Sequence, residues 1–322
     1  MNNISSRLML VFCFVIGTGQ ILSQTKDFWK ASAGPYGGFV RSLVIDSKGN
    51  LFAGTSSTGV FKSTDDGRSW VPIGKSLGRQ TIYTLNIGPE DQLFLGTNSG
   101  AYRSLDGGTT WESVAAELPV SNVYSYLFLP RGQIIAGTNA GIFISKNGGN
   151  SWTPTASKVQ DIRFMCFAKS KRGVIYSGTS RKGVFLSRND GQTWERVDTQ
   201  MTNFVIRDLV VNGIGHLFAA TNQGLFRSVD DGVRWVSANK GLSNLSAWTI
   251  IINRMNHIYV GTSGGVFRSF NNGQEWEKIN SGLKSHTNAR ALVMDKNGFL
   301  FAGTNGGVFY SNKSTSTGMM KR

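Results

Sequence analysis

Arginine and aromatic side chains recur at one position in seven similar segments of the chain. The segments read "FVRSLVI", "TIYTLNI", "NVYSYLF", "DIRFMCF", "VIRDLVV", "SAWTIII" and "NARALVM". Their third residues are Arg41, Tyr83, Tyr124, Arg163, Arg207, Trp248 and Arg290. Guanidinium forks bind carboxylate, sulfate or phosphate, and aromatic rings offer flat faces to sugars or peptide side chains. The chemistry that this column of residues predicts is the binding of an anionic ligand.

A second set of polar residues lies in short acidic turns. The stretch "STDDGRSW", residues 63–70, returns five times in the shape Ser-x-Asp/Asn-x-Gly-x-x-Trp. A calcium site is excluded because Asn147, Asn189 and Asn271 replace the acid in three copies, and the distal Glu of a calcium loop is missing. Asp or Asn instead accepts turn hydrogen bonds and Gly permits positive φ. We therefore expect structural joints and no metal or cofactor site.

These positions belong to a repeat that runs along the whole chain. Relatives of "LFAGT" end at Thr55, Thr97, Thr138, Thr179, Thr221, Thr262 and Thr304, with separations of 42, 41, 41, 42, 41 and 42 residues. Tryptophans follow the same spacing at 70, 111, 152, 194, 235 and 276, and one more lies 41 residues earlier, at Trp29. Seven repeats are therefore present.

Each repeat contains four short β-type runs and no sustained helical period, which is typical of a β-propeller. A solenoid would need capped ends. Here the last repeat lacks its acidic turn and its Trp, and "DFWKASAG" near the start of the chain supplies a matching strand. The sequence predicts an all-β, seven-bladed propeller of four-stranded antiparallel blades, closed by an N-terminal strand that completes the last blade.

The start of the chain indicates export. Residues 1–24 carry one Arg and an apolar run from Leu8 to Ile16, as in a secretory signal peptide, and the run is too short for an ordinary membrane span. We expect the propeller over residues 25–312 and a polar tail over 313–322. Cleavage would leave Cys166 alone, without a disulfide partner. The protein is expected to be periplasmic or secreted, with no stable membrane anchor.

The turn pattern resembles the Asp-box, or BNR repeat, of sialidase-type propellers. In that family the ligand face lies at the starts of the inner strands, opposite the Asp-box turns. The layout of one propeller with an arginine-lined face resembles the photosystem II stability/assembly factor-like family, whose members are exported, non-enzymatic and bind other proteins. The resemblance implies a binding scaffold. The net charge of +15 also favours an anionic partner.

We therefore expect a monomer that binds an anionic glycan or a protein partner without catalysis. Nucleic acid is not expected, because export removes the opportunity. The alternative is a carbohydrate-active enzyme, either a polysaccharide lyase or a sialidase- or xyloglucanase-like hydrolase. Hydrolysis needs paired carboxylates, and the loops of the expected ligand face hold only Glu117, Asp161 and Asp208. Asp208 follows Arg207 on a strand, so we expect it on the opposite side. A lyase remains an alternative, because lyases need Arg, Tyr or His near an acidic sugar and the sequence offers Tyr83, Tyr124 and His286.

A purely structural role for the column is a further alternative, in which the residues stack on one another between blades and cap the inner strands. Five more cations in nearby loops would add positive potential to a binding face: Lys75, Lys158, Arg181, Lys182 and Lys284.

Overall fold

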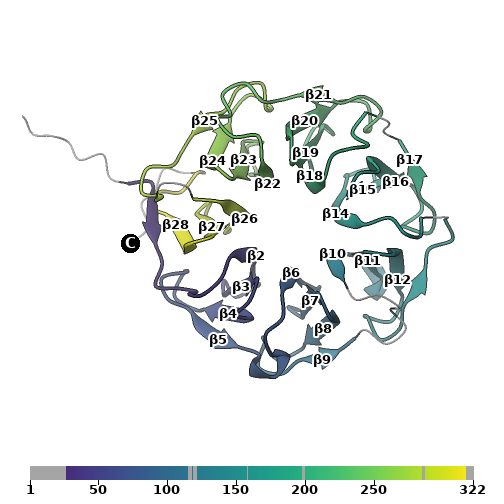
Figure 1. Cartoon of the computed structure of the whole chain (residues 1–322), viewed down its shortest axis with the longest axis horizontal. Helices are drawn as coiled ribbons and strands as arrows, with labels where there is room; N and C mark the ends of the chain where they lie inside the picture. The colour runs from purple at the N-terminus through teal and green to yellow at the C-terminus, as the bar shows by residue number, and fades with distance from the viewer. Residues whose placement is uncertain are drawn as a thin grey trace, which may run out of the picture.

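The computed structural model describes residues 27–114, 118, 122–157, 159–197, 200–284 and 287–316. Seven four-stranded antiparallel sheets stand around a central axis like the blades of a propeller (Figure 1). The predicted fold is confirmed. The expected signal peptide, residues 1–24, lies outside the described residues. Within those residues no helix has the length and apolar character needed to cross a bilayer.

The strands follow the chain in order, four to a blade. Blade 1 comprises β2 (Val40–Ile45), β3 (Leu51–Thr55), β4 (Val60–Ser63) and β5 (Val71–Ile73). Blade 2 comprises β6 (Ile82–Ile87), β7 (Leu93–Thr97), β8 (Gly100–Ser104) and β9 (Glu112–Ser113). Blade 3 comprises β10 (Val123–Phe128), β11 (Ile134–Thr138), β12 (Gly141–Ser145) and β13 (Thr153–Pro154). Blade 4 comprises β14 (Phe164–Lys169), β15 (Ile175–Thr179), β16 (Val184–Ser187) and β17 (Glu195–Arg196).

The second half of the ring repeats the arrangement. Blade 5 comprises β18 (Ile206–Val211), β19 (Leu217–Thr221), β20 (Gly224–Ser228) and β21 (Val236–Ser237). Blade 6 comprises β22 (Ala247–Ile252), β23 (Ile258–Thr262), β24 (Gly265–Ser269) and β25 (Glu277–Lys278). Blade 7 comprises β26 (Ala289–Met294), β27 (Leu300–Thr304), β28 (Gly307–Ser311) and, from the other end of the chain, β1 (Trp29–Ala31). Two single 3₁₀ turns, η1 (Lys75–Leu77) and η2 (Pro130–Gly132), complete the elements.

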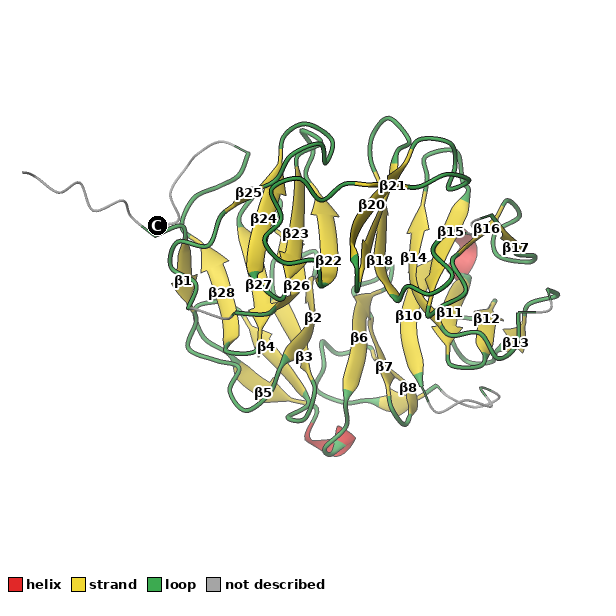
Figure 2. Cartoon of the chain, turned by 45° about the horizontal axis from the view of Figure 1, so that its top comes forward, coloured by secondary structure: helices red, strands yellow, loops and turns green. Residues whose placement is uncertain are grey.

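Ring closure is the pairing of β1 with β28, which lie side by side in Figure 2. Trp29 is 1% exposed, and its indole Nε1 donates a 2.6 Å hydrogen bond to the carbonyl oxygen of Ile279. Its backbone N–H donates to Ser281. The predicted closure by the N-terminal strand is confirmed. At the other end, Ser314 and Thr315 hydrogen bond to the Asn297–Gly298 turn, so the first residues of the expected tail pack against blade 7.

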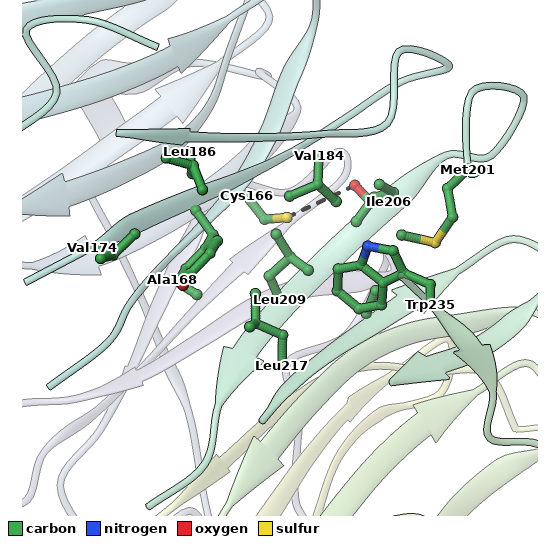
Figure 3. Close-up of a cluster of buried hydrophobic side chains, with 12 residues drawn as sticks. Cys166, Ala168, Val174, Val184, Leu186, Met201, Ile206, Leu209, Leu217 and Trp235 are labelled. Carbon is green, nitrogen blue, oxygen red and sulfur yellow. Dashed lines mark hydrogen bonds between the residues drawn. The ribbon is translucent and has the colours of Figure 1, made fainter. Parts of the chain in front are cut away.

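The hydrophobic core lies between adjacent blades. The second strand of every blade is buried along its whole length, because both of its faces meet neighbouring sheets. Figure 3 shows one such cluster, in which Cys166 of blade 4 packs with Leu209 and Trp235 of blade 5. The glycine of "LFAGT" allows this contact: a Cβ on Gly54 would lie 2.6 Å from Ile82 of the next blade. The repeated sequence therefore encodes the spacing between blades.

The acidic turns join the third and fourth strands of their blades. In blade 1, Asp65 Oδ1 accepts hydrogen bonds from the Ser63 hydroxyl and from the backbone N–H groups of Arg68 and Ser69. In blade 3, Asn147 Oδ1 accepts from the Ser145 hydroxyl and the Ser151 N–H in the same way. Either acceptor closes the turn, so the turns act as joints. No group of three or more His, Cys, Asp or Glu side chains in the described part of the chain is arranged to hold a metal.

Removal of Trp29 should weaken ring closure. We expect Trp29→Ala to lower the free energy of unfolding by roughly 3–5 kcal/mol, because a buried ring and its hydrogen bond are lost and the edge of β28 loses its partner. Urea denaturation would measure the change. Trp111→Ala is the matched control: Trp111 is half-buried and its indole Nε1 donates within its own turn, to the carbonyl oxygen of Gly108, so a smaller loss is expected. Equal losses would contradict a special role for β1.

Asp65 should act as a hydrogen-bond acceptor and not as a metal ligand. Hydrogen bonds from Ser69, Ser63 and Arg68 outweigh desolvation and lower the pKa of Asp65 to about 2. We expect Asp65→Ala to cost roughly 1–3 kcal/mol of unfolding free energy, and Asp65→Asn to cost much less, because Asn147 already serves this role in blade 3. Melting curves with and without calcium should coincide, and a calcium-dependent rise in Tm would revive the metal interpretation.

Candidate functional site

A β-bulge near the start of each inner strand places one residue of every blade at one end of the central channel. The pairing of the first and second strands shifts register at the same point in all seven blades. The residues at the bulge are Arg41, Tyr83, Tyr124, Met165, Arg207, Trp248 and Arg290. A bulge bends the strand and re-aims side chains, so these seven half-buried residues turn toward the axis.

This end of the channel contains a cavity of about 440 Å³. Six of the seven predicted residues line it: Arg41, Tyr83, Tyr124, Arg207, Trp248 and Arg290. The turns between second and third strands lie on this face, because they bond to the loops that enter the inner strands, as in the bond from Thr81 N–H to Asn98 Oδ1. We call this face, with the cavity at its centre, the mouth.

Arg163 is a correction to the predicted column. It lies two residues before the bulge of β14, is exposed, and does not line the cavity, where Met165 takes the equivalent place. The segment "DIRFMCF" matches the local pattern of the other six segments only when it is displaced by two residues. In every other repeat the column residue stands fourteen positions before the threonine that ends the second strand, and counting back from Thr179 gives Met165. The guanidiniums in the cavity wall are therefore three.

Two of those guanidiniums stack on Trp248. The Arg207 guanidinium carbon lies 3.6 Å from the ring centroid of Trp248, and that of Arg290 lies 4.2 Å from it. They come from the blades on either side of blade 6, so they flank the indole. Arg290 also lies over Phe39, at 4.5 Å. Trp248 therefore holds cations in place, and its faces are less free for a ligand than the sequence suggested.

The remaining members of the column form a second stack. Arg41 lies over Tyr83 at 5.2 Å, and the rings of Tyr83 and Tyr124 are 5.1 Å apart. Stacking between neighbouring blades is what the structural alternative predicts. It does not remove the charges, and an Arg held by an aromatic face keeps most of its N–H donors for another partner. The contacts thus support both a structural cap and a preorganised binding surface.

The three arginines carry unneutralised charge. None of the ion pairs formed by the described residues includes Arg41, Arg207 or Arg290. Burial and the repulsion of Arg290 lower the pKa of Arg207 to about 10, and burial with the repulsion of Arg41 lowers the pKa of Arg290. Arg207 donates to the Ser246 hydroxyl and the Ala247 carbonyl. Nε of Arg290 is buried without a hydrogen-bond partner. An anion would relieve this repulsion.

Asp208 is a second correction, because it lines the same cavity as Arg207 and does not point to the opposite side. The bulge breaks the alternation of side chains on which the expectation rested. Its carboxylate accepts hydrogen bonds from the N–H of Leu209, the N–H of Ile250 and the hydroxyl of Thr249, and so ties blade 5 to blade 6. Burial raises the pKa of Asp208 to about 6, against the effect of these bonds.

The other candidates lie away from the cavity. Asp161 is exposed in the loop before β14. The loop cations Lys75, Arg181, Lys182 and Lys284 do not line the cavity. Glu117, Lys158 and His286 lie outside the described residues. Sequence reasoning missed Phe39 and Met165. Constant spacing within the repeat would have found Met165, whereas the stacking of Phe39 from the preceding loop leaves no periodic signal.

The chain is similar to known propellers in sequence and in structure. A family model described as the DUF6242 beta propeller domain matches residues 10–134, less than half of the chain. No curated protein is detectably similar in sequence. Among solved structures, YCF48 bound to D1 peptide superposes with a TM-score of 0.70 and 16% identity over 89% of this chain and 97% of YCF48.

Two other solved structures are parts of larger proteins. The extracellular domain of a putative hybrid two component system from B. thetaiotaomicron matches with a TM-score of 0.74 and 18% identity, over 88% of this chain and 41% of that one. The GH74 enzyme of Niastella koreensis matches with a TM-score of 0.68 and 19% identity, over 88% of this chain and 53% of the enzyme. At these identities the likeness shows the fold: the chain is a seven-bladed β-propeller.

The raised pKa of Asp208 should appear in the pH dependence of stability. The folded protein protonates Asp208 more readily than the unfolded chain, so the stabilising effect of the proton is lost as pH rises from about 4 to about 6. We expect the stability of Asp208→Asn relative to the parent protein to rise by roughly 1–3 kcal/mol between pH 4.5 and 7.5. Denaturant titrations at both pH values would measure it. The exposed Asp161→Asn is the control, and parallel profiles for Asp208→Asn and the parent would contradict the assignment.

Proposed function

We propose that the protein is an exported recognition scaffold that binds an anionic ligand, either an acidic glycan or an acidic segment of a protein partner, at its mouth. The observation that carries the proposal is the set of three guanidiniums, Arg41, Arg207 and Arg290, gathered in one cavity wall without an ion-pair partner among the described residues. The aromatic stacks offset part of the cost of holding these cations close together, and an anion bound between them would offset more of it through charge-assisted hydrogen bonds.

The shape and lining of the cavity support a binding role. A volume of about 440 Å³ admits one or two sugar rings or a few peptide groups. The arginines lie in blades 5, 7 and 1, while Tyr83 and Tyr124 of blades 2 and 3 present aromatic surface across the channel. Such a wall suits a ligand with an anionic side and a flat or apolar side.

The similar proteins are consistent with either kind of partner. YCF48 was solved with a bound D1 peptide, and the Niastella koreensis protein is a GH74 enzyme. Export, with a final place in the periplasm or outside the cell, is part of the proposal and is supported by the signal-like residues 1–24. We propose that the protein acts as a monomer.

A carbohydrate-active enzyme is the second candidate, and Asp208 favours it. A carboxyl group with a pKa near 6 in a cavity has the properties of a general acid or base. Hydrolysis would require a second carboxylate, and no other acid among the described residues lines this cavity. Of the two kinds of enzyme, the residues that line the cavity fit a lyase, in which arginines would neutralise the carboxylate of a uronate. Its test is the release of unsaturated products from polygalacturonate.

The anion site can be tested with Arg41→Ala combined with Arg290→Ala. Oligogalacturonate and an oligoglutamate peptide serve as probes for the two ligand classes, with binding measured by calorimetry. We expect at least about a tenfold loss of affinity, because a charge-assisted hydrogen bond contributes roughly 1.5–3 kcal/mol. Binding by the parent protein should also weaken with added salt.

The control removes two charges elsewhere, with Lys30→Ala combined with Arg254→Ala, both exposed and outside the cavity. This variant should bind like the parent protein. A lower melting temperature of the mouth variant with unchanged affinity would show that the column is only a structural cap. Chemical conversion of either probe by the protein would show that it is an enzyme and would contradict a scaffold without catalysis.

A further inference from the structure

A groove opens between blades 3 and 4 on the face opposite the mouth. Its volume is about 600 Å³, and it is lined by Leu129, Pro130, Arg131, Gln133, Lys146, Lys169 and Asp190. The lining comes from the β10–β11 turn, from the residue after β12, from the end of β14 and from the β16–β17 turn. These are the ends of strands farthest from the mouth, so the groove is a separate site.

The junction at this groove has no arginine at the register position from which an arginine crosses at two other junctions. At the junction of blades 2 and 3, Arg103 of β8 crosses to the next turn and donates to the carbonyl oxygen of Gly148 at 2.6 Å. At the junction of blades 5 and 6, Arg227 of β20 donates to Asn272 at 3.1 Å. Blade 3 has Ile144 at this register position, and an apolar side chain makes no such bond. Gln133 crosses instead from the lining of the groove, to the carbonyl oxygen of Asp190 at 2.7 Å.

The charge of this groove differs from that of its counterparts. Three cations and one carboxylate line it, and the Lys169 Nζ atom lies 3.9 Å from Asp190 Oδ1. The groove between blades 7 and 1, of about 360 Å³, has two lysines and three aspartates in its lining. The groove between blades 2 and 3, of about 170 Å³, has Glu90 as its charged residue. Of these three grooves, the one between blades 3 and 4 alone has an excess of positive charge.

The backbone of Arg131 is a further departure from what the fold requires. Its φ is 64°, in the left-handed region, where Gly, Asn or Asp are favoured over Arg. Other turns of this type place Asp91 or Asn256 at positive φ. A residue held in such a conformation is a pointer to function, because stability alone would select a different side chain. Here the exposed guanidinium stands at the edge of the groove.

We propose that the groove between blades 3 and 4 is a second anion-binding site, which takes a linear chain carrying repeated sulfate or phosphate groups. Lys171 and Arg172 follow Lys169 in the sequence and extend the cationic surface beyond the groove. A flat anionic membrane fits less well, because this face as a whole mixes acids such as Glu90, Asp91 and Asp230 with cations such as Lys48 and Lys296, whereas the groove has an excess of positive charge. A narrow chain can contact blades 3 and 4 alone.

The test compares two pairs of substitutions in the full chain. Arg131→Ala with Lys146→Ala removes two cations from the groove, and Lys48→Ala with Lys296→Ala removes two from the acidic groove between blades 7 and 1. Both pairs are made in a protein that also carries Arg41→Ala and Arg290→Ala, so that the contribution of the mouth is lowered and is the same in both comparisons. Probes are a sulfated dextran oligosaccharide and a polyphosphate of similar length, with affinity measured by calorimetry at several salt concentrations.

We expect the first pair to lower affinity at least about tenfold and to reduce the slope of log affinity against log salt by about two, one for each lost contact. The second pair should change neither. The better of the two probes identifies the sulfate or phosphate source. Equal losses of affinity in both pairs would show that the effect comes from net charge alone and would contradict a specific site. Unchanged affinity in the first pair would also contradict the proposed groove site. Stronger binding to phosphatidylglycerol vesicles than to either chain would overturn the linear ligand.

Discussion

The pairing of one three-residue strand with the far end of the chain is the interaction on which the rest of the molecule depends. A single blade buries its second strand only if a neighbouring sheet lies on each side, and β1 provides the outer edge of the blade where the ring meets itself. Trp29 anchors this contact in the core between blades 6 and 7. The channel is a product of closure as well, because its wall is made of one inner strand from every blade.

The sequence was sufficient to predict the fold, since each physical requirement of a blade recurs at a fixed spacing. The glycine before Thr55 leaves room for the next inner strand, and the acceptor at Asp65 closes a turn. The site was predicted in part. Alternation of side chains along a strand is a good rule for regular pairing, but the bulge at Arg207 brings Asp208 into the same cavity. A register irregularity of this kind has no signature in one sequence, whereas the constant spacing of the repeat does distinguish Met165 from Arg163.

The contacts at the mouth show that a structural and a binding role are compatible. Trp248 carries a guanidinium from each neighbouring blade, and these stacks fix arginines that would otherwise lose side-chain entropy on meeting a ligand. The same stacks hold like charges close together, at a cost that appears in the lowered pKa of Arg207. The same stacks therefore bear on stability and on the proposed affinity for an anion, so both quantities need to be measured for any substitution there.

The methionine at the bulge of blade 4 has a consequence for how a partner is oriented. Seven equal blades would offer a ligand seven equivalent ways to enter the channel. With Met165 at the bulge of blade 4, the cations lie in blades 5, 7 and 1 with Trp248 of blade 6 among them, and the tyrosines lie in blades 2 and 3. The entrance thus has a cationic side and an aromatic side, although the backbone around it is nearly symmetric. For the partner proposed above, charge on one flank would select one angle of rotation about the channel, so that a nearly symmetric backbone would hold it in one direction.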